Sequence, residues 1–389
     1  RGIPGLVWRE GGNIAVGPAR PLVADLDMLP LPKRRPEPFV VGGVPMAFMI
    51  ASRGCIGECA YCSIRAFGRD AGGPRLRMRD TDAVADEAAS LYHDLGVRII
   101  LLQDDLFILP DEKKTIDRMR AITQAIRDRG VDRMLFWIKG RPDAITYPVV
   151  KAAGDLGAIH IFLGVENASI DRLRYLGRVH TPSDNARAIS MCLEHGIRPS
   201  FNFMLFDPDC RIKDIRETID FAGQYLDVPW NICRTEIFSG TRLLDRLRKQ
   251  GRLEGDYRTW GYKMKDQGAE IMFRILRVSF HERAFSFDSL LNKLITLSFT
   301  RHVHEELIPG TGTDAMSEKV DKLIVEVYRD TIDELIRIMD FAVGSSLGEK
   351  EKIRDFAVET ATSVNKRNHH WLSRAERLFF WLNARGTRI

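Results

Sequence analysis

The chain has 389 residues, of which 44% are hydrophobic and 29% charged, the proportions of a globular protein. Its net charge of +5 is small for this length and no run of lysines and arginines stands out, so a nucleic-acid partner is not expected. No apolar run approaches the roughly 18 residues that a membrane-spanning helix needs, which argues against a membrane protein. A chain of this length exceeds one ordinary core and predicts two or three structural units.

The first 45 residues contain several prolines and show little periodicity. This composition is typical of an extended segment without a core of its own. We therefore predict a linker over residues 1–45 that approaches or wraps the unit that follows.

From residue 46 to about residue 245, short β-rich runs alternate with helical patterns. Strands are expected at residues 46–51, 97–102, 134–138, 159–163, 200–205 and 231–237. This alternation favours a parallel sheet with helices outside it. Six such units predict an α/β fold, a partial (β/α)6 version of the eight-fold TIM-type barrel, over residues 46–245. Functional residues are expected at the C-terminal ends of its strands.

After about residue 245 the alternation stops and long helical patterns follow. Apolar residues between positions 320 and 339 form a stripe of the kind that a packed helix shows. We predict a helical C-terminal domain over residues 246–389, which closes the barrel mouth and contacts the substrate. His302 and His304 are expected on a solvated helix surface of this domain.

Three of the six cysteines, Cys55, Cys59 and Cys62, lie within eight positions, shortly after the first predicted strand. This grouping does not resemble a secreted disulfide framework and favours a reducing, cytoplasmic location. Three thiolates can surround an iron–sulfur cubane, each binding one iron, and leave the fourth iron open for a ligand. A zinc site stays open as the alternative, although the next cysteine is Cys192 and the nearest histidine is His93.

Residues 53–62 (RGCIGECAYC) resemble the signature of radical S-adenosylmethionine (SAM) enzymes, Cys-x3-Cys-x2-Cys with an aromatic residue before the last cysteine. The resemblance implies that Cys55, Cys59 and Cys62 hold a 4Fe-4S cluster, with Tyr61 at the cofactor site. In such enzymes the open iron chelates SAM, and the reduced cluster cleaves it to methionine and a 5′-deoxyadenosyl radical. An electron donor such as flavodoxin or ferredoxin is therefore implied as a partner.

Two further segments at predicted strand ends resemble SAM-binding positions of this superfamily. Gln103, Asp104 and Asp105 follow the second strand, where the resemblance implies binding of the SAM amino group. Glu166 closes the fourth strand and would hydrogen-bond the SAM ribose, while Arg178 would meet the SAM carboxylate. From the residues alone, a loop cap at Asp105 and a structural Glu166–Arg178 ion pair stay open as alternatives. No side chain is assigned to catalysis.

Residues 5–12 and 25–32 resemble the linker that precedes the barrel in cobalamin-dependent radical SAM proteins. The usual cobalamin motif, Asp-x-His-x-x-Gly, is nowhere in the sequence, so the resemblance implies cobalamin on a domain upstream of residue 1, unless this member has lost it. The leading hypothesis is cobalamin-dependent C-methylation of a natural-product, pigment or peptide substrate. The alternatives are a methylthiotransferase, which should end in a small β-barrel, an oxidative cyclase of the same superfamily, and a zinc-stabilised α/β binding protein.

Overall fold

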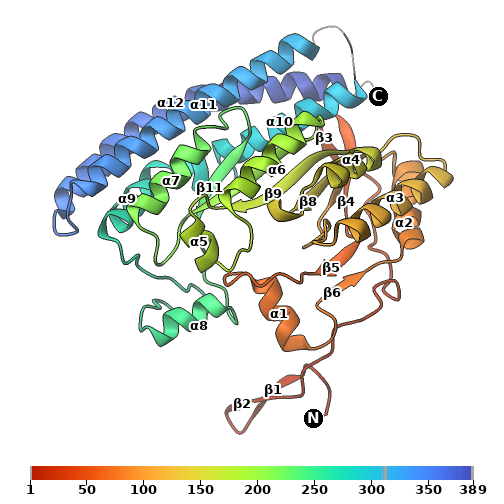
Figure 1. Ribbon diagram of the computed structural model, residues 1–389, viewed down its shortest axis with the longest axis horizontal. Helices are drawn as coiled ribbons and strands as arrows, with labels where there is room; N and C mark the ends of the chain where they lie inside the picture. Colours follow the sequence, from red (N-terminus) through yellow and green to blue (C-terminus); the bar gives the residue numbers. More distant parts are fainter. Residues whose placement is uncertain (1, 309, 311–312, 387–389) are drawn as a thin grey trace.

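The computed structural model describes residues 2–308, 310 and 313–386. Its centre is a curled sheet of seven strands in the order β11-β10-β9-β8-β7-β4-β3 (Figure 1). Six of the strands run parallel to each other, namely β4 (Val44–Met49), β7 (Ile99–Leu102), β8 (Leu135–Gly140), β9 (Ala158–Glu166), β10 (Arg198–Phe206) and β11 (Trp230–Arg234). The edge strand β3 (Phe39–Val41) pairs antiparallel with β4.

Helices connect the parallel strands and cover the outer face of the sheet (Figure 1). They are α2 (Thr81–Leu95), α3 (Glu112–Asp128), α4 (Tyr147–Leu156), α6 (Pro182–Glu194) and α7 (Ile212–Ala222). Short helices α5 (Ile170–Tyr175) and η1 (Pro142–Ala144) lie in the connecting loops. The predicted partial (β/α)6 barrel is confirmed. Strands β9 and β10, on either side of α6, are longer than the sequence pattern predicts.

Side chains of the strands alternate between the two faces of the sheet. Ile100, Ile138 and Ile161 point to the outer face and are completely buried in a core shared with the helices. Trp137 and Phe162 belong to the concave face, where they line a hollow. The concave face therefore offers space for ligands, while the outer face supplies the packing that holds the strands in place.

The N-terminal end of the barrel is closed by helix α10 (Leu290–Leu307). Phe299 and Val303 of this helix pack in one cluster with Val44 and with the first residues of the neighbouring strands. The expectation of solvated histidines on this helix is wrong, because His302 is 6% and His304 2% exposed. The barrel covers the side of α10 that carries these two histidines, and His304 Nε2 lies 2.7 Å from the Gly42 carbonyl oxygen.

The predicted linker contains more regular structure than its prolines suggest. Strands β1 (Val7–Glu10) and β2 (Asn13–Val16) form an antiparallel hairpin that projects from the body of the molecule (Figure 1). Gly11 and Gly12 form its two-residue turn, with φ angles of 55° and 88°, the conformation that such hairpins need and that glycine adopts at little cost.

The remainder of the described chain is mainly helical, with one longer loop, residues 250–266, that contains an isolated β-bridge between Glu254 and Gly261. After α8 (Arg242–Lys249) come α9 (Gln267–Ser279), a π-helical turn (His281–Phe285), α10, α11 (Thr313–Val343) and α12 (Lys350–Gly386). None of the helices in the described ranges combines the length and the apolar character needed to cross a membrane. The division into units at residues 45 and 245 stays a prediction, and position 245 itself falls inside α8.

Candidate active site at the barrel mouth

The three clustered cysteines lie in a loop between strand β5 (Ser52–Gly54) and helix α1 (Ser63–Ala71). Strand β5 pairs antiparallel with β6 (Leu76–Met78), which ties the two ends of this segment together. Gly54, with φ of 90°, packs so closely on the backbone of Arg75 that a Cβ atom would collide with its carbonyl oxygen. The sequence therefore needs glycine directly before Cys55.

All three thiols are free of disulfides and half-buried, and protein donors surround their sulfur atoms. The Gly57 amide donates a hydrogen bond of 3.2 Å to Cys55 Sγ, and Arg178 Nη1 donates one of 3.3 Å to Cys59 Sγ. Cys62 is the N-cap residue of α1, where the first amides of a helix favour negative charge. Such donors stabilise thiolates, the form in which sulfur binds metals.

Space between the sulfurs is kept open by Gly57. A Cβ atom on this residue would lie 3.3 Å from Cys55 Sγ and 3.9 Å from Cys59 Sγ. No group of three or more His, Cys, Asp or Glu side chains in the described part of the chain is gathered as a site for one metal ion. Thiolates around a cubane need not converge on one ion because each binds a different iron, so this donor set fits a cluster.

The acid–base state of the free thiols follows from their partial burial. Burial raises the pKa of Cys55, although the Gly57 amide counteracts it, and burial likewise raises the pKa of Cys62 against the amides of Arg65 and Ile64. Metal binding by these residues must therefore release protons, and it becomes weaker as the pH falls.

Glu166 and Arg178 meet beside the cysteine loop. Arg178 Nη1 lies 3.6 Å from Glu166 Oε1, and its Nη2 donates a 2.7 Å hydrogen bond to the Gly164 carbonyl oxygen. Burial opposes the charge of Arg178, but the carboxylate of Glu166 raises its pKa. Burial and the same carboxylate raise the pKa of Tyr61. The structure thus brings together three of the predicted cofactor residues.

The backbone at Glu166 is unusual. Its φ of 64° is the one positive value at a non-glycine residue among the described positions, and the pairing of β9 with β10 shifts register here, between Phe201 and Phe203. Bulges and left-handed residues of this kind recur at functional sites because they redirect a side chain at the end of a strand.

Burial alternates along the three consecutive residues Gln103, Asp104 and Asp105, so they do not share one environment. Asp104 is completely buried and accepts hydrogen bonds from the Ala51 amide (3.0 Å) and the Ser52 hydroxyl (2.5 Å), while burial raises its pKa. It holds the turn that leads into the cysteine loop and presents no surface to a ligand, contrary to the predicted contact with SAM. Gln103 and Asp105 are exposed and keep that place in the proposal.

Lys139 was not predicted from the sequence as a site residue. It comes from β8 and its Nζ lies 3.0 Å from Gln103 Oε1. Burial lowers the pKa of Lys139, and the carboxylate of Asp105 opposes this shift. A lysine within an apolar strand was the available signal, because a buried strand rarely places a charge without a partner or ligand.

A cavity of about 610 Å³ lies next to Tyr61, between the ends of β10 and β11 and the helical part of the chain. Met204, Cys233 and Phe273 contribute to its wall. Thr235 also lines it, is 1% exposed and has a hydroxyl without a hydrogen-bond partner. A second hollow of about 330 Å³ shares residues with it and continues along the concave face. The two together form a partly open space that begins beside Tyr61.

Comparison with known proteins agrees with this geometry. The family model described as "Radical SAM superfamily" matches residues 49–222 of the sequence. An uncharacterized methyltransferase, PH0819 of Pyrococcus horikoshii, is 29% identical over 249 residues, which make up 62% of this chain and 51% of that protein. The anaerobic magnesium-protoporphyrin IX monomethyl ester cyclase of Cereibacter sphaeroides is 28% identical over 59% of this chain and 38% of its own length. The chain thus spans about half or less of these relatives.

Solved structures share the fold. The cobalamin-dependent SAM radical enzyme OxsB with aqua-cobalamin bound superposes with a TM-score of 0.60 at 14% identity, covering 98% of this chain and 64% of that one. The radical SAM methyltransferase TsrM of Kitasatospora setae gives a TM-score of 0.53 at 20% identity over 64% of this chain and 49% of its own. With the matched family, the cysteine motif and the barrel in agreement, this chain belongs to the radical SAM superfamily.

Proposed function

We propose that Cys55, Cys59 and Cys62 hold a 4Fe-4S cluster whose open iron binds SAM at the mouth of the barrel. The observation that carries this proposal is the pair of hydrogen bonds on the sulfurs, from Gly57 to Cys55 and from Arg178 to Cys59. A cluster with SAM bound to it supplies the reductive cleavage of the SAM sulfonium, chemistry that side chains alone do not provide.

The surrounding side chains have separate tasks in this proposal. Asp105 and Gln103, exposed near the loop, provide oxygens for the SAM ammonium group, and Lys139 orients Gln103 through their 3.0 Å contact. Glu166 offers a carboxylate to the ribose hydroxyls, held in place by Arg178. Tyr61, whose hydroxyl stays protonated because burial raises its pKa, lines the cavity directly beside Cys62 in the sequence.

The cavity is the proposed place for the substrate. Its wall combines aromatic side chains with polar atoms that lack partners, including the Thr235 hydroxyl and Asn202 Oδ1. Unsatisfied buried polar atoms carry a free-energy cost that a hydrogen-bonding ligand removes. Side chains from the helical part of the chain, including Phe273 and Phe285, line one side of this space, and a bound substrate would displace water from it, which a radical reaction needs to avoid side reactions.

For the complete protein we propose a cobalamin-dependent methyl transfer to an unactivated carbon of a natural-product, pigment or peptide substrate. The support is the description of a sequence relative as a methyltransferase and of two proteins with the same fold as cobalamin-dependent or methyltransferase enzymes. Cobalamin would be bound by a domain upstream of residue 1, and we assign it no residue among those described.

An oxidative cyclase is the second candidate, favoured by the magnesium-protoporphyrin monomethyl ester cyclases, one of which, from Rubrivivax gelatinosus, is 30% identical over 242 residues. A methylthiotransferase finds less support. The putative methylthiotransferase MJ0865 of Methanocaldococcus jannaschii is 23% identical over 84% of this chain, a lower identity than that of the methyltransferase and cyclase relatives.

The test is anaerobic reconstitution with iron and sulfide, followed by addition of SAM and a strong reductant. Mass spectrometry measures 5′-deoxyadenosine and S-adenosylhomocysteine, and a variant with all three cysteines changed to alanine is the control. Iron uptake and SAM cleavage by the wild type, with neither in the variant, support the proposal. Uptake of zinc in place of iron overturns it in favour of a zinc-stabilised protein.

A further inference from the structure

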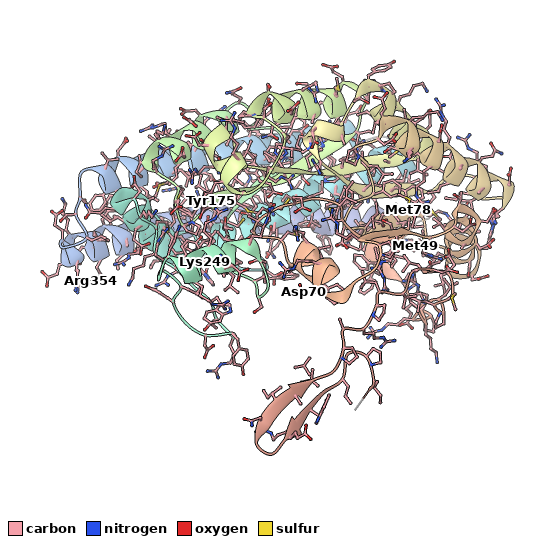
Figure 2. The ribbon with its side chains drawn as sticks, turned by 60° about the horizontal axis from the view of Figure 1, so that its bottom comes forward. Met49, Asp70, Met78, Tyr175, Lys249 and Arg354 are labelled. Atoms are coloured by element: carbon pink, nitrogen blue, oxygen red, sulfur yellow. The ribbon has the colours of Figure 1, made fainter. Side chains whose placement is uncertain are left out.

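Asn202, in the middle of β10, borders both hollows of the concave face. Its neighbours Phe201 and Phe203 are buried in the core on the outer face, so the alternation of the strand turns Asn202 inward. Figure 2 turns the barrel mouth forward and labels Met49, the last residue of β4. Since β10 continues to Phe206, Asn202 lies inside the barrel and not at its rim.

The side-chain amide of Asn202 makes no hydrogen bond to any residue that the structure describes, and its Oδ1 atom is buried. Asn231, which stands opposite it on β11, behaves differently. Its Nδ2 atom donates hydrogen bonds to the Ala284 carbonyl oxygen (3.2 Å) and to Asn292 Oδ1 (2.8 Å). Asn231 therefore ties the barrel to the helical part of the chain, whereas the amide of Asn202 contributes no bond to the fold.

The chemistry of a free carboxamide restricts the group that can satisfy it. A buried polar atom without a partner carries a free-energy cost, and folded proteins leave few of them. The amide of Asn202 offers an acceptor and a donor side by side, so its complement presents a donor and an acceptor side by side. A peptide backbone or another amide does so. A carboxylate offers acceptors alone, and a single hydroxyl cannot align with both ends of a planar amide at once.

A second unpaired group, the Thr235 hydroxyl, lines the larger cavity nearer the mouth; Thr235 is 1% exposed. Its backbone is fixed, because its amide donates a 2.7 Å hydrogen bond to the Phe206 carbonyl oxygen and its own carbonyl oxygen accepts one of 3.0 Å from the Tyr262 hydroxyl. Thr235 follows Asn231, the partner of Asn202, by four positions. The two unpaired groups are therefore about 13 Å apart along the strand direction, and a ligand that meets both is elongated.

The wall between these two polar groups is mainly apolar. Met204 and Cys233 are opposite each other in the pairing of β10 with β11, and both line the cavity. Phe273 and Phe285 contribute aromatic rings from the helical part of the chain. Methionine and aromatic side chains accept apolar groups of varied shape. Hydrogen-bonding groups at two levels with apolar wall between them suit an extended chain that carries apolar side chains on a polar backbone.

We propose that the substrate is a peptide or peptide-like amide, bound as an extended chain of about four residues, and that Asn202 determines specificity by pairing with one of its backbone amides. The inference rests on the proposed function, because the cavity is a substrate site only if chemistry takes place at the cysteine loop beside it. A magnesium tetrapyrrole offers Asn202 no amide N–H, so the inference favours the methyltransferase over the cyclase as the activity of this chain.

The experiment measures binding, with a pooled library of N-acetylated, C-terminally amidated tetrapeptides as one probe and magnesium-protoporphyrin IX monomethyl ester as the other. The whole chain is used in two forms, iron-loaded with SAM and metal-free. Mass spectrometry identifies the retained compounds, and calorimetry gives their Kd. Asn202→Leu removes the amide, and Asn202→Asp keeps its shape but replaces the donor with an acceptor. Asn383→Leu is the matched control, since Asn383 is an exposed residue of α12.

We expect the wild type to retain a subset of the tetrapeptides and both Asn202 variants to bind them at least about tenfold more weakly, while Asn383→Leu keeps the wild-type Kd. Each peptide bond of the best peptide is then replaced in turn by an ester, which lacks the N–H. One position should weaken binding to the wild type and have no further effect on Asn202→Leu, the sign of a direct contact. The ester series on the wild type does not depend on the folding of any variant.

Retention of no peptide, or of the tetrapyrrole alone, would overturn the inference, and so would a peptide Kd that Asn202→Leu leaves unchanged or that both leucine variants weaken equally. Iron content and SAM cleavage are measured on the same preparations. A chain that takes up no iron contradicts the proposed function, and the metal-free form separates the two failures. Peptide binding that depends on Asn202 persists in this form if the cavity is assigned correctly, and is absent from both forms if the inference is wrong.

Discussion

Arg178 links Cys59 to Glu166, because its Nη1 atom lies 3.3 Å from Cys59 Sγ and 3.6 Å from Glu166 Oε1. The side chains of Arg178 and Glu166 are only 8% and 15% exposed. The sequence left open whether these two residues form a structural ion pair or bind SAM. Their geometry is compatible with both roles, since an arginine can hold the carboxylate in place while the carboxylate receives a ligand.

Replacing Arg178 with glutamine should destabilise the metal-free chain by about 3 kcal/mol, because it leaves the Glu166 carboxylate buried without its partner. The measurement is the free energy of unfolding in urea. The double variant Arg178→Gln with Glu166→Gln should recover part of this loss, since it removes the unpaired charge. Additive losses would show that the two side chains do not interact.

The sequence predicts the barrel well because its outer layer obeys local rules. Gly96 is an example, because α2 ends at Leu95 with Gly96 at a φ of 65°, a conformation that favours glycine. The strands are rich in apolar residues because their outer faces pack against the helices. These signals depend on neighbouring residues and need no knowledge of the tertiary structure.

The site is less predictable because its side chains act across the barrel. Asp104 and Asp105 are equivalent as letters, yet one is completely buried and the other exposed, and only the two-residue alternation beyond β7 separates them. Cys233, in β11, lines the cavity, and burial raises its pKa to about 12. Its position depends on the neighbouring strand and on helices more than 30 residues away, which the local sequence does not specify.

Gly57→Ala should lower the iron content of the reconstituted protein while leaving the fold unchanged. The added methyl group would lie 3.3 Å from Cys55 Sγ and 3.9 Å from Cys59 Sγ, in the space that a cluster needs. Iron and sulfide are measured per chain, and circular dichroism checks the fold. Gly261→Ala is the matched control, since a Cβ atom there meets nothing within 4 Å. Full iron content in Gly57→Ala would contradict the proposed placement of the cluster.

Tyr328→Phe should destabilise the protein by about 1–3 kcal/mol. The Tyr328 hydroxyl accepts a 2.7 Å hydrogen bond from the Trp230 amide and donates one of 2.5 Å to the Trp230 carbonyl oxygen, and both residues are completely buried. Its loss leaves the backbone at the start of β11 without a partner where α11 packs on it.

Urea unfolding measures this effect. Tyr147→Phe is the control because Tyr147 is 59% exposed, and its hydroxyl should contribute less than about 0.5 kcal/mol. If the two variants lose the same small amount of stability, the hydroxyl does not anchor the helical part of the chain to the barrel.

His160 should make the stability of the fold depend on pH. The residue lies inside the barrel with Nε2 2.7 Å from Ser200 Oγ, and burial, assisted by the nearby His302, lowers its pKa from 6.5 to about 3. As the pH falls below 6.5, the unfolded chain therefore binds a proton at His160 that the folded chain does not bind. The stability from neutral His160 is complete above pH 6.5 and decreases toward pH 3, by about 1.4 kcal/mol for each unit.

The variant His160→Gln keeps a hydrogen-bonding group near Ser200 but does not titrate. Between pH 7 and pH 5, the free energy of unfolding of the wild type should fall by about 2 kcal/mol more than that of the variant. Urea unfolding of the metal-free chain at both pH values gives this difference directly. Parallel pH profiles for the two proteins would mean that His160 is protonated in the folded barrel and that water reaches this part of the concave face.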